Sequence, residues 1–465
     1  MLAQLTATLN NWLYTYILVI LLIGAGLYFT VRTRFVQFRM LGESFRVVRE
    51  KGKSGGVSSF QALMVSTASR VGTGNIAGVS AALCLGGVGA VFWMWVIALL
   101  GGASAFVEST LAQIYKVHDG QGDSRGGPAY YIQAAIGSRG LAALFAVLLI
   151  LTYMVGFNLV ASFNLVDSFA GYGFFDSRTP LIAGAALALV TAVCIFGGGK
   201  RLTAITSVLV PVMGGAYVLM ALVMIVLHLE LVPGVLAAIF ENAFDFQALF
   251  GGFTGSAMMY GIKRGLFSNE AGVGSAPNAA AAANVSHPVK QGLAQVLSVF
   301  IDTLLICSAT AFLCLCSGVE PDAALKGVPY VQAALAGTFG AFGHWFITGA
   351  MLLFAFTTIL GNYYYCESNF QYLLRRDARR WELAAFRLAA VYVVFLGAQM
   401  DFSLVWDLAD VLMGGMVLIN LPVICRLSGT VLAGLRDYTR QKAQGKDPVF
   451  RAADIGLEGR TDFWN

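Results

Sequence analysis

Long apolar runs are the feature that most constrains this chain. Eleven segments of about 20 predominantly apolar residues, the length that crosses a bilayer as a helix, recur along the 465 residues. Only 12% of the residues are charged, about half the share of a soluble domain, so they cannot cover a water-facing surface. We therefore predict an all-α integral membrane protein in a lipid bilayer. Its eleven transmembrane helices are predicted near residues 12–31, 57–83, 88–115, 140–170, 180–197, 203–228, 249–283, 290–316, 344–373, 381–398 and 402–430.

The basic residues are sorted between alternate connecting segments. With the N-terminus outside, 24 of the 30 lysines and arginines fall in inner segments, and only Arg178 and Lys326 fall in outer ones. Because basic residues accumulate on the cytosolic side of membrane proteins, this split predicts an outer N-terminus and a cytoplasmic C-terminus. The sorting also accounts for the net charge of +5 without a nucleic-acid partner.

Two of the predicted spans, near 57–83 and 249–283, are interrupted by glycine and polar residues and resemble each other. The sequence VGTGNIAGV at 71–79 aligns with GLFSNEAGV at 265–273, at an offset of 194. Each copy holds five spans, an odd number, so the second copy is inverted relative to the first. Inverted repeats of five helices with a broken first helix are the pattern of the LeuT-type transporter fold. Two further pairs of similar segments lie at an offset of about 200. They are PAYYIQAA at 128–135 with PYVQAA at 329–334, and MGG at 213–215 with MGG at 413–415.

The repeat predicts a division of the chain into five parts. One span lies outside the 5+5 repeat, as an extra N-terminal helix. Backbone groups freed at each break can bind ligands at mid-membrane, whereas an unbroken helix uses them internally. The predicted parts are an extra helix with a basic cytosolic segment (1–56), the first repeat (57–228), an extracellular linker (229–248), the second repeat (249–430) and a cytosolic tail (431–465).

Six motifs in order resemble one transporter family, the alanine or glycine:cation symporters, also described as sodium:alanine symporters. They are RVGTGNIAG at 70–78, GAVFWMW at 89–95, RGGPAY at 125–130, FSNEAGVGSAPNAA at 267–280, FAFTT at 354–358 and WDLAD at 406–410. The resemblance implies a non-enzymatic symporter of the bacterial inner membrane, which imports alanine or glycine together with Na⁺ by alternating access. It indicates neither an organic cofactor nor an obligatory protein partner.

One departure bears on the substrate. Relatives carry a Gln and, two residues later, an Asn in the third span of the repeat, where this chain has Ala161 and Phe163. Asn158 or Asn164 is a candidate for the missing polar role. Transport of a different amino acid, L- or D-selectivity, and proton coupling in place of sodium coupling therefore stay open.

The predicted substrate site lies at the two breaks. Glycine lets the backbone leave helical geometry, and the exposed N–H groups can hold a substrate carboxylate. A glycine-rich helix crossing is the plainer alternative. The predicted substrate-binding residues are Gly72, Thr73, Gly74 and Asn75 at the first break, Phe267, Ser268 and Asn269 at the second, and Trp406 and Asn158 beside them.

The predicted sodium site follows from the resemblance. Thr357 and Thr358 place two adjacent hydroxyls in an apolar span, and the corresponding helix donates oxygen ligands in LeuT-type sodium carriers. By alignment with that fold, the carbonyls of Ala68 and Val71 complete the site. The alternative is that both hydroxyls bond back to their own helix.

Four charged residues lie within the two interrupted spans: Arg70, Lys263, Arg264 and Glu270. Charges at membrane depth are costly and face an aqueous path or pair with one another, so we predict a gating network of ion pairs. A channel is disfavoured by the two broken helices of a single chain. An intramembrane enzyme is disfavoured because no catalytic constellation is visible.

Overall fold

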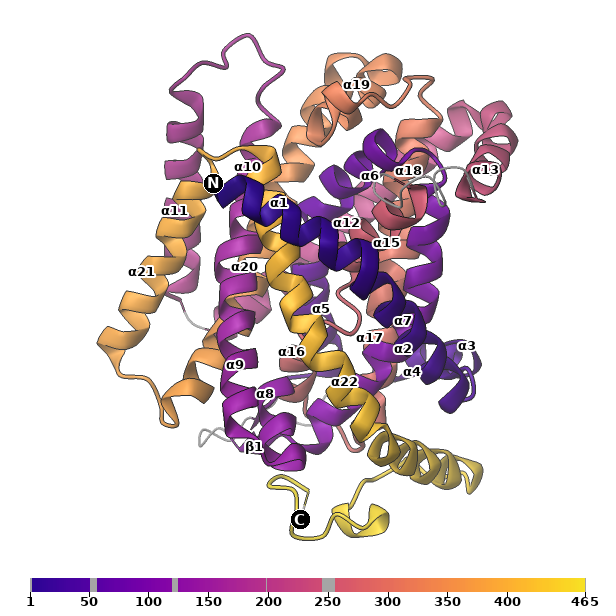
Figure 1. Cartoon of the computed structure of the whole chain (residues 1–465), viewed down its shortest axis with the longest axis vertical. Coiled ribbons are helices and arrows are strands. Elements are labelled where there is room, and N and C mark those ends of the chain that lie inside the picture. Colours follow the sequence, from indigo (N-terminus) through magenta and orange to yellow (C-terminus); the bar gives the residue numbers. More distant parts are fainter. Residues whose placement is uncertain (1, 51–56, 119–123, 198, 245–255, 465) are drawn as a thin grey trace.

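The fold is almost entirely helical. A computed structural model describes residues 2–50, 57–118, 124–197, 199–244 and 256–464 (Figure 1). Two short strands, β1 (Val117–His118) and β2 (Ser124–Arg125), pair antiparallel in the connection after α7 (Ala90–Ile114).

Seven helices among the described residues are long and apolar enough to cross a membrane. Three of them contain a π-helical stretch. They are α1–η1–α2 (Leu2–Trp12, Leu13–Leu18 and Val19–Arg32), α7, α9–η4–α10 (Arg139–Ile150, Leu151–Phe157 and Asn158–Asp167), α12 (Gly199–Leu227), α17–η7–α18 (Pro288–Val299, Phe300–Cys307 and Ser308–Leu315), α20 (Ala341–Leu374) and α22 (Phe402–Ala443).

The other four predicted spans fall on shorter or interrupted helices, so the count of eleven and the inverted repeat stay predictions. Two are uninterrupted, α11 (Thr179–Ile195) and α21 (Arg380–Gly397). The other two are the pairs α5 (Ser59–Arg70) with η2–α6 (Gly74–Gly78 and Val79–Gly86), and α15 (Ala257–Asn269) with α16 (Pro277–Ala282).

Several connecting segments carry short helices. Part of the 229–248 linker is helical, and α22 continues past residue 430, where its span is predicted to end, into the 431–465 tail. The short helices are α3 (Val36–Arg39), α4 (Leu41–Arg49), α8 (Pro128–Tyr131), η3 (Ile132–Ile136), η5 (Leu229–Leu231), α13 (Val232–Glu241), η6 (Asn242–Phe244), η8 (Ala323–Leu325), α19 (Val328–Phe339) and η9 (Ala452–Ile455).

The two ends of the chain lie at opposite ends of the molecule. In Figure 1 the N-terminus lies at the end that carries α10, α13 and α19, and the C-terminus lies with α8 and β1 at the other. An odd number of crossings requires this arrangement. The basic-residue distribution predicts that the end with α8 and β1 faces the cytosol.

Glycine lets the interrupted helix α15 pack closely on α7. A Cβ at Gly261 would lie 2.3 Å from the carbonyl oxygen of Ala90, and one at Gly265 would lie 2.5 Å from Ile97. Small residues at helix crossings allow such close approach in membranes. Large apolar side chains on outer helices instead face outward, such as Leu189 of α11, which is 67% exposed.

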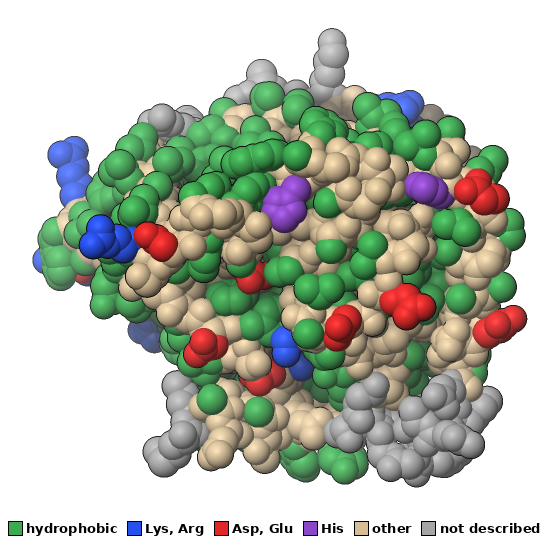
Figure 2. All heavy atoms as spheres, turned by 90° about the horizontal axis from the view of Figure 1, so that it is seen from above, with side chains coloured by type: hydrophobic (Ala, Val, Ile, Leu, Met, Phe, Trp, Pro, Cys, Tyr) green, Lys and Arg blue, Asp and Glu red, His purple; other side chains and the backbone are tan. Residues whose placement is uncertain are grey.

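The end of the molecule with α13 and α19 carries few charges. Seen from that end, acidic and basic side chains are scattered singly among apolar and uncharged ones (Figure 2). The exposed apolar side chains along the outer helices, such as Leu189, are instead the surface suited to lipid.

Candidate functional site

The first interruption lies between α5 and the π-helical turn η2. Val71 and Gly72 leave the helix, Thr73 again has helical backbone angles, and η2 begins at Gly74. Gly72 is required there by close packing, because a Cβ on it would lie 2.0 Å from the Thr358 hydroxyl of α20. The helical N-terminus that restarts at Gly74 presents its positive dipole end to this gap.

The second interruption is longer and begins after Asn269. Glu270 has a φ of 53°, and Gly272 and Gly274 have φ values of 86° and 92°, so the segment relies on left-handed backbone conformations. Phe267, Ser268 and Asn269, predicted to form this break, instead form the last turn of α15. Carbonyl groups in a last turn lack intrahelical partners, so they still face the interruption.

A small closed cavity separates the two interruptions. It holds about 10 Å³, room for about one water molecule and too little for any amino acid. Aromatic rings close it: Phe267 packs between Phe157 and Trp406, with ring centroids 4.5 and 4.6 Å away. Its lining residues are Ser69, Arg70, Gly72, Thr73, Gly74, Phe157, Phe267 and Thr358.

Asn75 joins the first interruption to its neighbours. Its side-chain oxygen accepts from the Gly72 N–H at 2.8 Å, and its amide donates to Ser268 Oγ at 3.1 Å and to Asp302 Oδ1 at 2.7 Å. Asn75 and Ser268, predicted from the two breaks, thus meet at one buried carboxylate.

Asp302 is a site residue that the sequence analysis missed. It is fully buried in the π-helical stretch η7, and it also accepts from Ser268 Oγ at 2.5 Å and from Thr303 Oγ1 at 2.9 Å. A single acid inside an apolar span was the available signal. Carboxylate and hydroxyl oxygens of this kind suit a hard cation. No group of three or more His, Cys, Asp or Glu side chains gathers anywhere in the described ranges.

The two predicted sodium-ligating threonines face different surroundings. Thr357 Oγ1 donates to the Leu353 carbonyl of its own helix at 2.9 Å, the alternative considered from the sequence. Thr358 Oγ1 is buried without a hydrogen-bond partner in the described structure and faces Gly72. Ala68 and Val71, at the end of α5, are also buried.

Lys263 and Arg264 form ion pairs, as predicted for buried charges, but their partner is Asp410. Lys263 Nζ and Arg264 Nη2 lie 3.0 and 2.5 Å from Asp410 Oδ2, and the Asp410 side chain is 0% exposed. The Arg264 guanidinium also stacks 4.4 Å from the Trp406 ring centroid. Trp406 therefore forms part of a charged cluster beside the cavity, to which Asn10 of the extra N-terminal helix donates a hydrogen bond.

Arg70 and Glu270 do not extend this network by a direct ion pair. Arg70 Nη1 donates to Gln295 Oε1 at 3.0 Å, whereas Glu270 accepts from Ser69 Oγ at 3.3 Å and from Ser275 Oγ at 2.5 Å. No salt bridge joins Arg70 to Glu270 within the part of the chain that the structure describes. The single predicted network is therefore two clusters, because the left-handed turn at Glu270 directs its carboxylate toward Ser275.

Asn158 and Asn164, the two candidates for the polar role in the third span, form different hydrogen bonds. Asn164 Nδ2 donates to Thr73 Oγ1 at 3.3 Å, so Asn164 takes a polar role at the first break. Asn158 Oδ1 accepts from Asn362 of α20 at 2.9 Å and ties two helices together. Ala161 is buried, and Phe163 packs edge-on against Phe402.

Two interrupted helices that meet at a small cavity in a bundle of membrane-length helices are the arrangement typical of secondary transporters. The chain belongs to the sodium:alanine symporter family, whose profile matches residues 1–452. It is 47% identical to the amino-acid carrier protein AlsT of Bacillus subtilis, over 98% of this chain and 96% of that one. It is 46% identical to the probable sodium/glutamine symporter GlnT of the same organism (95% and 91% covered). It is 37% identical to the sodium/alanine symporter AgcS of Methanococcus maripaludis (94% and 97% covered).

Solved structures share the fold. The crystal structure of MhsT in complex with L-phenylalanine superposes with a TM-score of 0.54, at 15% identity, over 88% of this chain and 93% of that one. A manganese transporter of Eremococcus coleocola gives 0.53 at 14% identity, over 87% and 81%. The protein is accordingly a multi-pass membrane transporter for amino acids with a LeuT-type architecture.

Proposed function

We propose that this protein imports a small neutral amino acid, alanine or glycine, together with Na⁺ by alternating access. The observation that carries the proposal is the meeting of Gly72 with the unpartnered Thr358 hydroxyl, at the wall of the closed cavity. Freed backbone groups and a hydroxyl there offer oxygen ligands where bulk water is absent.

The substrate would lie between the two helix ends that face the cavity. The N-terminus restarting at Gly74 favours a carboxylate, and the last carbonyls of α15, from Phe267 to Asn269, favour an ammonium. The rings of Phe157, Phe267 and Trp406 leave little room for a side chain. This geometry supports alanine or glycine over a bulky amino acid, although the cavity must open to admit either.

The sodium site we propose uses Thr358 with the carbonyls of Ala68 and Val71. Thr357 is a weaker candidate, because its hydroxyl already donates to Leu353 within α20. Sodium binding and substrate binding would be coupled because the first interruption would contribute to both sites. Ligand binding would then favour one closed arrangement of α5 against α20.

The two charged clusters are proposed as gates. Arg264, Asp410 and Trp406 close the side from which α15 enters, and Arg70 with Glu270 closes the side from which α5 enters. Alternating access requires that the two clusters open in turn.

Relatives keep one alternative open. A close relative bears the name putative sodium/proton-dependent alanine carrier protein, and another the name sodium/glutamine symporter. The buried Asp302 carboxylate favours proton coupling as the alternative, because a carboxylate can bind a proton as well as a sodium ion.

Uptake into proteoliposomes tests the proposal. Radiolabelled alanine should accumulate under an inward sodium gradient, and should fail to do so when potassium replaces sodium with or without an imposed proton gradient. Unlabelled glycine should compete, and leucine and glutamine should not. Accumulation driven by protons alone, or stronger competition by glutamine than by alanine, would replace the proposal with its alternative.

A further inference from the structure

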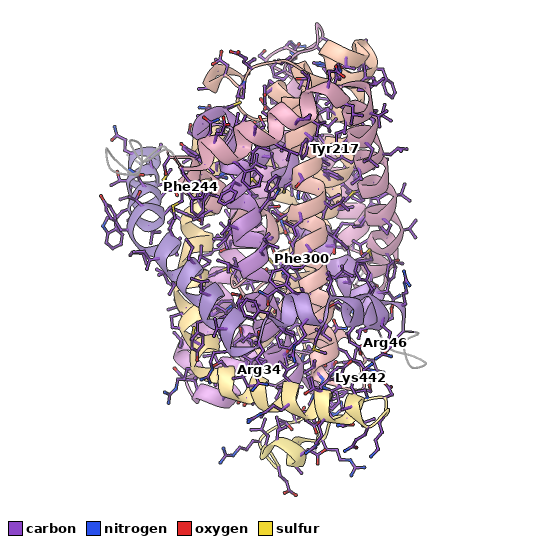
Figure 3. The ribbon with its side chains drawn as sticks, turned by 90° about the vertical axis from the view of Figure 1, so that its right-hand side faces the viewer. Arg34, Arg46, Tyr217, Phe244, Phe300 and Lys442 are labelled. Atoms are coloured by element: carbon purple, nitrogen blue, oxygen red, sulfur yellow. The ribbon has the colours of Figure 1, made fainter. Side chains whose placement is uncertain are left out.

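A cavity lined by arginines lies far from the substrate site, at the end of the molecule predicted to face the cytosol. It holds about 540 Å³ and opens between the end of α2, the short helix α3 and the terminal part of α22. Figure 3 shows Arg34 directly beside that part of α22. The residues that define it are Arg32, Arg34, Arg39 and Arg436, with Val31 and Leu432 as apolar walls.

The cavity lies where the first membrane-length helix ends. Arg32 ends the first membrane-length helix, Ala3–Arg32, so the arginines begin where the apolar span stops. Val31, one residue earlier, is 63% exposed, and Phe35 and Phe38 beyond the turn are 53% and 47% exposed. Aromatic and basic side chains are typical of the boundary between hydrocarbon and headgroups.

Among the described residues, no carboxylate compensates the positive charge of the cavity. None of the four arginines forms an ion pair with any carboxylate of the described ranges. Glu43, on the neighbouring helix α4, instead accepts from Arg46 at 2.7 Å and Lys442 at 3.0 Å. Asp437, adjacent to Arg436 in α22, is directed to Arg440 and His287.

The backbone that forms the cavity is held in an uncommon conformation. Arg34 and Phe35 both have a φ of 56°, a left-handed conformation that non-glycine residues rarely adopt. The turn is fixed by hydrogen bonds from the Arg34 and Phe35 N–H groups to Val31 and Thr30. It places the Arg34 guanidinium on the cavity and leaves the Phe35 ring exposed. Strained turns of this kind cluster at ligand sites.

We infer that this cavity binds the phosphate headgroup of an anionic phospholipid, with the acyl chains along Val31 and Leu432. Arginine guanidinium groups match phosphate oxygens with paired hydrogen bonds. Basic pockets between transmembrane helices on the cytosolic side bind anionic lipids in other membrane proteins. A bound headgroup would join α2 and α3 to α22, and so would fix the extra N-terminal helix to the end of the repeat.

Lipid binding to the purified protein tests the inference. Native mass spectrometry would count phosphatidylglycerol molecules bound to the wild type and to a variant with Arg34→Gln, Arg39→Gln and Arg436→Gln. Each arginine near an anionic surface contributes about fivefold in affinity, so the triple variant should bind roughly 100-fold more weakly. Phosphatidylcholine should bind weakly to both proteins.

Three controls make the result decisive. A variant with Arg376→Gln and Arg380→Gln removes charge from the same end of the molecule outside the cavity, and should bind phosphatidylglycerol as the wild type does. Lysine in place of the three arginines keeps the charge but not the paired hydrogen bonds, so it should bind more tightly than the triple glutamine variant and less tightly than the wild type, which separates loss of charge from misfolding. Displacement of the lipid by millimolar inorganic phosphate would make this a site for a soluble anion and overturn the lipid assignment. Unchanged phosphatidylglycerol binding in the triple glutamine variant would overturn the site itself.

Discussion

The two interrupted helices share a similar sequence, at 71–79 and 265–273, but differ in how the helix is broken. The first break is short, at Val71 and Gly72, and contains no left-handed residue. The second runs from Glu270 to Ala276 and uses three left-handed residues. At the breaks themselves, glycine therefore serves close approach in the first helix, at Gly72, and backbone geometry in the second, at Gly272 and Gly274. Residues at aligned positions of the two repeats can therefore have different structural roles.

The charges of the two helices differ in the same way. Lys263 and Arg264 of the second helix share a buried carboxylate, Asp410, whereas Arg70 of the first has no such partner among the described residues. Two buried cations that share one anion depend heavily on it. An arginine that donates to an amide depends less on any single neighbour.

Removal of Asp410 should have the largest effect. Asp410→Ala leaves two buried cations unpaired, and we expect a loss of about 3–5 kcal/mol in the free energy of unfolding, together with loss of uptake. The matched variant Glu270→Gln breaks no ion pair and keeps an oxygen for Ser275, so about 1 kcal/mol should be lost. Thermal unfolding of both proteins in detergent is the measurement. Equal losses would remove the distinction between the two clusters.

Alanine at the glycines should separate their two roles. Gly72→Ala places a Cβ 2.0 Å from Thr358 Oγ1, and Gly274→Ala places one 2.8 Å from the Phe145 ring at a φ of 92°. Each should cost about 1–3 kcal/mol. Adding Thr358→Ala should restore the stability of the Gly72 variant. Adding Phe145→Ala should not restore the Gly274 variant, because the backbone strain and the contact with Pro128 Cγ, also 2.8 Å away, both persist. Recovery in both double variants would show that the contacts with Thr358 and Phe145 account for the whole loss.

The two threonines allow a finer comparison, at the first break alone. Thr358→Val removes the hydroxyl that faces Gly72, and should raise the half-saturating sodium concentration for uptake by about tenfold, or about 1.4 kcal/mol. Thr357→Val removes a hydroxyl bonded to its own helix and should change that concentration less than about twofold. Sodium titration of alanine uptake measures both. The reverse order of effects would move the cation site to Thr357.

The sequence located the breaks because glycine and charge inside an apolar run are costly and therefore conspicuous. It could not show that Thr357 and Thr358 face different neighbours, because that depends on the rotation of α20 against α5. Asp302 carried the same kind of signal, an acid inside an apolar run, but it was missed because its run contains no glycine break that marks it as a site. Asp410 was visible in a family motif, but its pairing with Lys263 and Arg264 joins helices about 146 residues apart in sequence.

The smallest expected effect concerns the helices that follow the two interrupted ones. The helix after the first, α7, has Gly89 as its N-cap and no side-chain cap, whereas the N-cap of α17 is His287, whose Nδ1 accepts from the Val289 N–H at 3.2 Å. Burial lowers the pKa of His287 below its ordinary value of 6.5, although Asp437, 3.3 Å away, opposes the shift.

The sign of the pH dependence follows from that lowered pKa. Below pH 6.5 the unfolded chain takes up a proton that folded His287 does not yet bind, so stability falls as the pH drops through this value. One titrating group changes stability by at most about 1.4 kcal/mol per pH unit, so we expect a loss of about 1 kcal/mol between pH 6.5 and 5.5. His287→Asn keeps a capping oxygen and cannot titrate, so its thermal unfolding curve should lose that much less over the same interval. All other titrating groups are common to both proteins. Equal losses of stability in the wild type and the His287→Asn variant would show that the cap of α17 is as insensitive to pH as the uncapped start of α7.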